Sequence, residues 1–222
     1  MTVFLNMTFN MIIILLICYN KDMQTIKYSK MDIKQIIDRL LQGGILAFPT
    51  DTVFGLACIM DKNAISKVYE AKGRSFDKPL PMMCNGKDMI DNVAIINSDA
   101  EKLIDKFMPG AITIIFNKKD NVEDYVTNGR NTIGIRVPND EWILNLIEEI
   151  GMPLLVTSAN ISGDGSLLKW EDVYECMNGK IDGIVCEDAR GDLASTIVDC
   201  SNEAKIIRQG PLSSEEIMGA LK

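Results

Sequence analysis

The sequence predicts an α/β fold in which a twisted, mixed β-sheet of about seven strands is flanked by helices. Short apolar runs of strand length alternate with amphipathic stretches from Met23 onward, and neither a repeat nor a low-complexity linker divides them. With 222 residues, of which 47% are apolar and 24% charged, the chain can bury one sizeable core. We therefore expect a single domain over residues 23–222.

Helices are expected where apolar residues recur at intervals of three or four. Residues 32–42 place isoleucine and leucine side chains on one face, with Asp32 as a candidate N-cap and Gly43 as the stop. Two Ser-x-x-Glu pairs, at 98–101 and 213–216, have the spacing of a capping box and predict helices that begin there. Besides 32–42, the predicted helices are 63–71, 98–106, 141–150, 170–177 and 214–221.

Strands are expected where short apolar runs are bounded by glycine, proline or polar turn residues. The run ILAF, residues 45–48, is typical of a buried strand. Seven or eight such segments, interleaved with the helices, favour a mixed sheet. The other strands predicted are 80–84, 112–116, 133–137, 154–156, 183–186, 196–198 and 205–207.

Residues 1–22 stand apart from this pattern. Their apolar run, from Met11 to Tyr19, is shorter than the roughly 20 residues that span a bilayer, so we expect no transmembrane helix. A signal peptide stays open, although the run lacks a basic n-region and a small-residue cleavage site. The alternative is an N-terminal extension upstream of a true start at Met23. In that case its removal is expected to leave activity intact.

Charge and composition narrow the function classes. A net charge of −8 argues against a general nucleic-acid footprint, which needs a basic face. The chain has no histidine, so Ser-His and Cys-His nucleophile pairs are excluded. The six cysteines contain no C-x-x-C pair, which gives zinc and thioredoxin-like sites no support and fits reduced thiols in a cytosolic protein.

One stretch runs against the acidic composition. KGRSFDKPL, residues 72–80, places Lys72, Arg74 and Lys78 close together beside a glycine and a proline. Taken alone, the stretch is compatible with a solvated turn and with an anion-binding loop.

Two hydroxyl-rich loops follow predicted strands. PTDTVFGL, residues 49–56, continues from ILAF, and TSANISG, residues 157–163, continues from LLV. Ligands bind at such strand ends in α/β sheets. Taken alone, each loop is also explained by turn and cap residues, because Ser, Thr, Asn and Asp bond locally to the backbone.

Together with NTIGIRV (131–137), STIVD (195–199) and IIRQGP (206–211), these motifs resemble, in this order, the TsaC/YrdC family of threonylcarbamoyl-adenylate synthases. The resemblance covers about residues 24–212. It implies a YrdC-like catalytic domain of the short, single-domain bacterial type. The implied enzyme is a nucleotidyltransferase that joins L-threonine, bicarbonate and ATP into threonylcarbamoyl-AMP with release of pyrophosphate, for threonylcarbamoyladenosine modification of tRNA. Such chemistry depends mainly on positioning and on neutralising phosphate charge, so it does not require histidine.

The resemblance also implies the roles of individual residues. Lys72 and Arg74 would hold the triphosphate and serve catalysis, and Arg136 would bind the carboxylate of threonine. Lys78 stays open between a phosphate contact and a solvated turn. The ATP-binding residues implied are Lys72, Arg74, Ser75, Thr132, Asn160 and Arg208. The threonine-binding residues implied are Thr50, Thr52, Arg136, Ser158 and Ser195.

Magnesium is expected to enter with ATP, because it offsets phosphate charge and takes few protein ligands. Its ligands are not assigned; Asp51 is a candidate, with helix capping or loop bonding as the alternative. The acidic string EDARGD, residues 187–192, is interpreted as a solvated loop or a mobile lid. The expected partners are the three substrates and a downstream tRNA threonylcarbamoyl-transferase complex in the cytoplasm. Weak tRNA binding stays open, and no membrane partner is expected.

Two features depart from the family pattern. Many members carry a histidine shortly after the basic motif, where this chain has LPMMC (80–84), and Phe76 stands where small residues are often found. Two other functions stay open: a carbamoyl-adenylate-forming enzyme of the same fold, similar to the matching domain of hydrogenase-maturation carbamoyltransferases, and a structured-RNA-binding module without catalysis. Missing zinc-finger cysteine pairs weigh against the first, and acidity weighs against the second.

Overall fold

A computed structural model of the chain describes residues 24–222. The interpretations of residues 1–22, and the start at Met23, therefore lie outside the described residues. Within 24–222, no helix is both long enough and apolar enough to cross a membrane.

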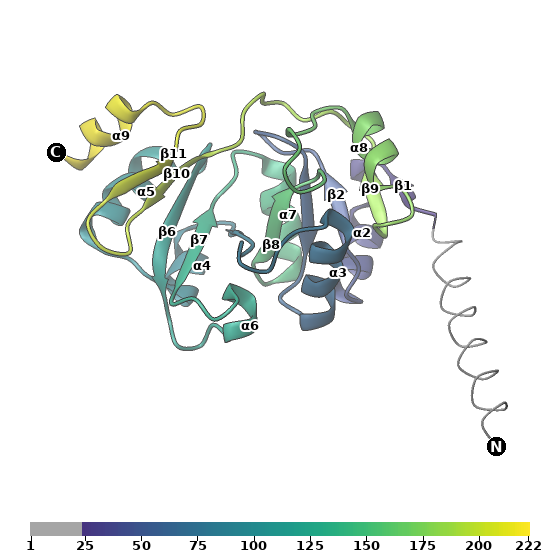
Figure 1. Ribbon diagram of the computed structural model, residues 1–222, viewed down its shortest axis with the longest axis horizontal. Coiled ribbons are helices and arrows are strands. Elements are labelled where there is room, and N and C mark those ends of the chain that lie inside the picture. Colours follow the sequence, from purple (N-terminus) through teal and green to yellow (C-terminus); the bar gives the residue numbers. More distant parts are fainter. Residues whose placement is uncertain (1–23) are drawn as a thin grey trace, which may run out of the picture.

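The described strands form one mixed sheet (Figure 1). The strands follow one another in the order β1-β9-β2-β3-β8-β4-β7-β6-β10-β11, and β5 pairs with β6 off this path. Their bounds are β1 (Ile26–Tyr28), β2 (Leu46–Phe48), β3 (Gly55–Cys58), β4 (Met82–Met83), β5 (Ala94–Ile95), β6 (Ile112–Lys118), β7 (Thr132–Arg136), β8 (Leu154–Ser158), β9 (Gly183–Val185), β10 (Thr196–Asp199) and β11 (Lys205–Arg208).

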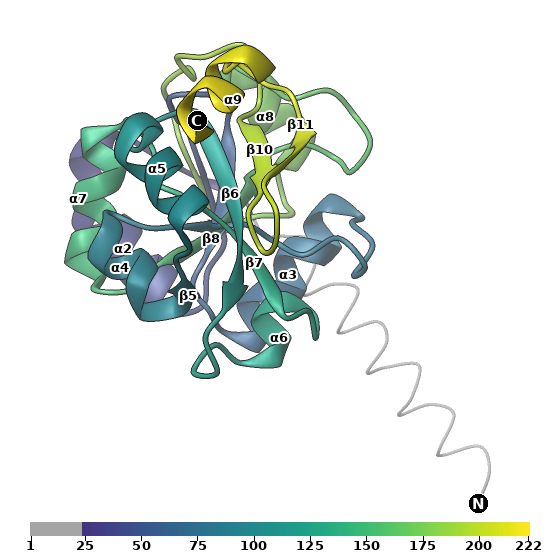
Figure 2. The ribbon, with the colours of Figure 1, turned by 90° about the vertical axis from the view of Figure 1, so that its left-hand side faces the viewer.

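Helices lie on both faces of this sheet. In Figures 1 and 2, α2, α4, α5 and α7 lie on one face, and α3 and α6 lie on the other. A short 3₁₀ turn (Lys30–Asp32) precedes α2. The helix bounds are α2 (Ile33–Leu41), α3 (Lys62–Lys72), α4 (Lys87–Val93), α5 (Ser98–Phe107), α6 (Asp124–Thr127), α7 (Glu141–Ile150), α8 (Trp170–Met177) and α9 (Ser214–Leu221).

The predicted fold class is confirmed, but the sheet has eleven strands among the described residues rather than about seven. Every predicted strand segment contains a strand, and α7, α8 and α9 have the predicted bounds. The unpredicted strands β1, β3 and β5 have two to four residues each, too few for a periodic pattern. Helices α4 and α6 were not predicted either, and both are short.

The structure confirms one predicted capping box and corrects another. At the start of α9, Ser213 and Glu216 form the reciprocal pair. At α5 the prediction is wrong, because Asn97 is the N-cap and its side chain accepts the Ala100 N–H at 2.9 Å. Asp32 is the N-cap residue of α2, as predicted, but its side chain makes no capping bond and accepts instead from Ser29, one turn earlier.

The core positions the functional face of the sheet. On β6 and β7, the cross-strand partners Ile114 and Ile135 are fully buried in the main hydrophobic cluster. Because successive side chains of a strand point to opposite faces, the residues between these positions face away from that cluster. On β7 these are Thr132, Gly134 and Arg136.

Candidate active site

A cavity of about 330 Å³ opens where the residues that alternate with the core of β6 and β7 meet the two predicted polar loops. Thr113 and Ile115 of β6, together with Thr132 and Arg136 of β7, line it. Gly134 leaves room between them, since a Cβ there would lie 3.4 Å from Thr113 Cγ2. The period-two pattern of NTIGIRV therefore builds one wall of the cavity.

Positive charge dominates the lining although the whole chain is acidic. The cavity is lined by four arginines, and none of its lining residues is Asp or Glu. Because a concave surface with charge of one sign raises the local concentration of ions of the other sign, the cavity favours anionic ligands. The arginines are Arg74, Arg130, Arg136 and Arg208.

Arg136 is the most constrained of these arginines. It is 5% exposed; its Nε donates to the Gly110 carbonyl at 2.9 Å and its Nη1 to Thr52 Oγ1 at 2.6 Å. Its Nη2 lies 2.7 Å from Asp51 Oδ1 as an ion pair, but the alignment leaves both atoms without a hydrogen-bond partner among the described residues. Burial lowers the pKa of Arg136, and the Asp51 charge opposes that shift. A buried guanidinium with an unsatisfied donor is suited to a carboxylate ligand.

The two threonines of the first polar loop have different surroundings. Thr50 Oγ1 donates to the Val53 carbonyl at 2.6 Å and accepts the Thr52 N–H at 3.1 Å, so it closes the loop. Thr52 Oγ1 instead contacts Arg136. Both line the cavity, and Thr52 is the one whose hydroxyl orients a charged group.

The C-terminal motifs hold another hydroxyl pair and an arginine. Ser195 Oγ lies 2.7 Å from Thr113 Oγ1, and the Ser195 carbonyl accepts from Arg208 Nη2 at 2.8 Å. The buried hydroxyl of Thr196 accepts the Gly210 N–H at 2.9 Å and so ties the turn after β11 to β10. Partial burial lowers the pKa of Arg208.

The basic loop, residues 72–80, begins where Gly73 ends α3 in the left-handed region at φ 56°. The Arg74 guanidinium folds back on this loop, donating from Nε to the Lys78 carbonyl at 2.9 Å and from Nη2 to the Pro79 carbonyl at 3.2 Å. Arg74 lines the cavity, whereas Ser75 and Lys78 are exposed outside its lining.

Lys72 lies beneath the second polar loop rather than in the cavity lining. It is 1% exposed, and its Nζ donates to the carbonyls of Ser158 and Asn160 and to Asn160 Oδ1. Burial, followed by the charge of Arg74, lowers the pKa of Lys72 to about 8. The Asn160 amide is also used inside its loop, donating to Asp164 O at 2.7 Å. Ser158 itself reaches the cavity.

The cavity thus brings together most of the predicted site residues. Lys72, Ser75 and Asn160 do not line it. Four polar lining residues, Thr113, Arg130, Thr157 and Ser166, were not predicted. Arg130 continues the two-residue spacing of the β7 residues that face the cavity, and this spacing could have revealed it. The predicted residues in the lining are Thr50, Thr52, Arg74, Thr132, Arg136, Ser158, Ser195 and Arg208.

The two departures from the family pattern border this site. LPMMC supplies an apolar wall through Leu80 and Met82. Phe76 is 60% exposed, and its ring stacks on Tyr69 with centroids 4.5 Å apart.

The acidic string EDARGD, residues 187–192, packs on the first polar loop, because the backbone N–H of Arg190 donates to the Thr50 carbonyl at 3.1 Å.

In the part of the chain that the structure describes, we looked for side chains that could bind a metal ion and for reactive thiols. No group of three or more Asp, Glu or Cys side chains there could hold a metal ion. Asp51, the candidate ligand, pairs with Arg136 and accepts the Asn139 N–H at 3.0 Å. Its observed role is loop bonding. Burial raises the pKa of Cys58 and of Cys84 to about 12, which keeps both thiols protonated at neutral pH.

The chain is similar to known proteins. The family model Sua5/YciO/YrdC, described as "Telomere recombination", matches residues 38–210. The chain is 36% identical over 190 residues to the threonylcarbamoyl-AMP synthase of Bacillus subtilis, covering 83% of this chain and 55% of that protein. It is 32% identical over 209 residues to a putative threonylcarbamoyl-AMP synthase of Methanocaldococcus jannaschii, covering 89% and 97%.

A solved structure is also similar to the chain. The crystal structure of Pyrococcus abyssi Sua5 complexed with L-threonine has a TM-score of 0.81 and 32% identity, over 89% of this chain and 60% of that one. The chain spans about half the length of the curated relatives from B. subtilis and P. abyssi.

Proposed function

Because the chain belongs to the Sua5/YciO/YrdC family, we propose that it forms threonylcarbamoyl-AMP and pyrophosphate from L-threonine, bicarbonate and ATP. The observation that carries the proposal is a single cavity with two kinds of lining. On one side lies the buried Arg136 among hydroxyl side chains, and on the other lies Arg74 of the basic loop. An amino acid and a nucleotide triphosphate need these two environments side by side.

On the amino-acid side, Arg136 binds the threonine carboxylate. Its guanidinium has five N–H donors but contacts only Gly110, Thr52 and Asp51 among the described residues, so donors remain for a carboxylate oxygen. Thr52 holds the guanidinium in place, and Ser158 and Ser195 contact the rest of the substrate, which is supported by their position in the cavity lining.

On the nucleotide side, Arg74 and Arg208 neutralise phosphate charge. Bicarbonate supplies carbon dioxide by loss of water, and the neutral amine of threonine adds to its carbon and releases a proton to solvent, which gives a carbamate. A carbamate oxygen then attacks the α-phosphorus while pyrophosphate leaves. The residues contribute by holding the two substrates in line and by stabilising the charge that develops on the phosphate oxygens. Lys72 supports this arrangement from below by fixing the Ser158 and Asn160 carbonyls.

Magnesium would be held chiefly by the phosphates of ATP and by water. This fits the donor set, since the lining contains hydroxyls and arginines but no carboxylate. Bound there, the ion would offset phosphate charge; no protein ligand is assigned to it.

The place of the reaction follows from its product. Threonylcarbamoyl-AMP is an activated mixed anhydride, so we propose that a tRNA threonylcarbamoyl-transferase complex consumes it in the cytoplasm. Direct tRNA binding by this chain is a further element of the proposal.

The decisive experiment is ATP–pyrophosphate exchange with purified protein. We expect exchange to require both L-threonine and bicarbonate. Exchange that requires carbamoyl phosphate instead would select the carbamoyl-adenylate reaction, and RNA retention without exchange would select the binding module. Either result would overturn the proposal.

A further inference from the structure

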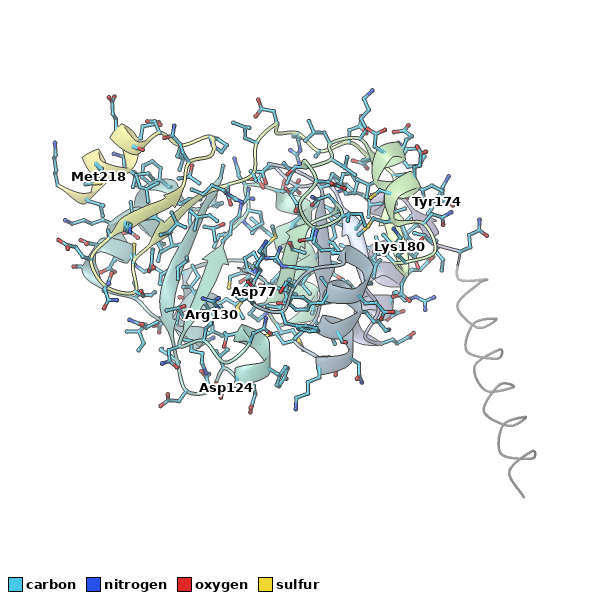
Figure 3. The ribbon with its side chains drawn as sticks, viewed as in Figure 1. Asp77, Asp124, Arg130, Tyr174, Lys180 and Met218 are labelled. Carbon is cyan, nitrogen blue, oxygen red and sulfur yellow. The ribbon has the colours of Figure 1, made fainter. Side chains whose placement is uncertain are left out.

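The turn between α6 and β7, residues 128–130, reaches across to the basic loop. Arg130 lines the cavity, and its Nη2 donates to the Asp77 carbonyl at 2.6 Å. Figure 3 shows the two residues next to one another. Among the described residues Arg130 takes part in no ion pair. It is therefore a cavity arginine whose charge is not neutralised by a bound carboxylate.

Asn128 makes a second connection from the same turn. Its Nδ2 donates to Tyr69 Oη and to the Phe76 carbonyl, both at 2.6 Å. Tyr69 Oη in turn donates to the Lys78 carbonyl at 2.9 Å, and the Tyr69 ring stacks on Phe76. Asn128 adopts a left-handed φ of 54°, a conformation that Asn tolerates better than most residues. The turn thus holds Phe76 and Asp77 of the basic loop directly, and Lys78 through Tyr69.

We propose that the turn 128–130 is a second arm of the nucleotide-phosphate site. Arg130 contacts the β- and γ-phosphates of ATP, and pyrophosphate after the reaction, while Asn128 is a positioning residue for the basic loop. The proposal rests on the proposed function for the identity of the ligand. The cavity charge and the hydrogen bonds to the loop are independent of it.

A fork of five donors makes Arg130 suited to this role. Only one of its donor groups is used within the described protein, by a neutral carbonyl, so the others are available to phosphate oxygens. Arg74 approaches from the opposite end of the same loop and also bonds to loop carbonyls. Two arginines braced by one loop form a clamp that can be ordered before the nucleotide arrives.

The first test measures binding of inorganic pyrophosphate by calorimetry to the wild-type full chain, Arg130→Met and Arg130→Lys. We expect Arg130→Met to weaken binding by tenfold or more, as for one charge-assisted hydrogen bond, and Arg130→Lys to weaken it less. Arg39→Met, which removes one positive charge from α2, is the matched control and should bind as the wild type does. Unchanged affinity in Arg130→Met would overturn the role of Arg130.

The second test separates positioning from general damage. Asn128→Gly keeps a backbone that accepts φ 54° but removes the amide, and Asn121→Gly is the control in a neighbouring loop. We expect Asn128→Gly to raise the KM for ATP severalfold while the KM for threonine stays constant. A drop in Tm with equal effects on both substrates would overturn the positioning role.

These outcomes remain distinguishable from failure of the proposed function. Pyrophosphate binding needs neither threonine nor turnover. A protein without threonine-dependent exchange whose pyrophosphate affinity still depends on Arg130 would retain the phosphate site and lose only the assigned reaction.

Discussion

The two sides of the cavity are built differently. The hydroxyl wall consists of Thr52, Thr113, Arg136, Ser158 and Ser195. Thr52 lies in the loop between β2 and β3, the other four lie in strands or next to them, and the wall is mostly buried. The basic loop, residues 72–80, is mostly exposed after Lys72 and is held by side-chain bonds to its carbonyls.

This difference sets how much each group can contribute. Charges removed from water interact more strongly, and they cost more when they lose a partner. Exposed cations are screened by salt and are individually weak. We therefore expect substitutions in the hydroxyl wall to have large effects on one substrate, and substitutions in the basic loop to have smaller, salt-dependent effects.

Arg136→Met should have the largest effect. It removes the guanidinium that pairs with the threonine carboxylate. The loss of such a charge-assisted pair costs about 1.5 to 3 kcal/mol, which should raise the KM for threonine by about ten- to a hundredfold. The KM for ATP should change much less. It also leaves Asp51 buried without its cation, which should lower the free energy of unfolding by about 3 kcal/mol.

The double variant Asp51→Asn, Arg136→Met is the control for that stability loss. It should recover much of the unfolding free energy but not threonine binding. Equal increases in both KM values in the single variant would contradict the assignment of Arg136 to threonine.

Gly134→Val should weaken ligand binding, by less than Arg136→Met does, with little change in stability. The new Cβ would lie 3.4 Å from Thr113 and 3.8 Å from Ile115 and Pro81, and the two further methyl groups would occupy the cavity. Valine suits a strand, so the free energy of unfolding should change by less than about 1 kcal/mol. Calorimetric titration and thermal unfolding measure the two effects. The affinity of Gly134→Ala should lie between those of the wild type and Gly134→Val. If Gly134→Val binds threonine normally, the ligand lies elsewhere.

Lys72→Met tests the buried cation of the basic loop. The folded-state pKa of Lys72 is lowered from 10.5 to about 8, so between these pH values the unfolded chain holds a proton that the folded protein has released. Stability then rises with pH in this window. Compared with Lys72→Met, the wild type should gain unfolding free energy from pH 8 to pH 10.5, by at most about 3 kcal/mol. Denaturant unfolding of both proteins across this range measures the difference. A constant difference would show that Lys72 is not desolvated.

Long periodic segments were predictable from the sequence, because their own pattern determines them. The helix α7, predicted with its observed bounds, and the strand β7, predicted within one residue of its observed bounds, are examples. Strand β3 was missed because it begins at Gly55 and continues a polar loop, and its strand state depends on pairing with β2 and β8. Local residues could not show that pairing.

The site residues divide in the same way into those with a local sequence signal and those whose position depends on distant residues. The arginine and hydroxyl residues inside motifs were found through the resemblance of those motifs, in their order, to the family. The placement of Lys72 beneath Ser158 was not predictable, because 86 positions separate the two in sequence. Arg130 was missed because an Asn-Gly pair before it indicates only a turn.

Lys78→Ala should have the smallest effect and settles the interpretation that the sequence left open. The Lys78 side chain is exposed and makes no hydrogen bond or ion pair with the described residues, whereas its carbonyl holds Tyr69 and Arg74 and is unaffected by the substitution. The loss of one screened charge near the phosphate site should raise the KM for ATP less than threefold at low ionic strength and not at all at high ionic strength. Steady-state kinetics at two salt concentrations measures this. An increase above tenfold that persists in high salt would mean that the basic loop closes on the nucleotide and buries Lys78, so that the loop would then resemble the hydroxyl wall.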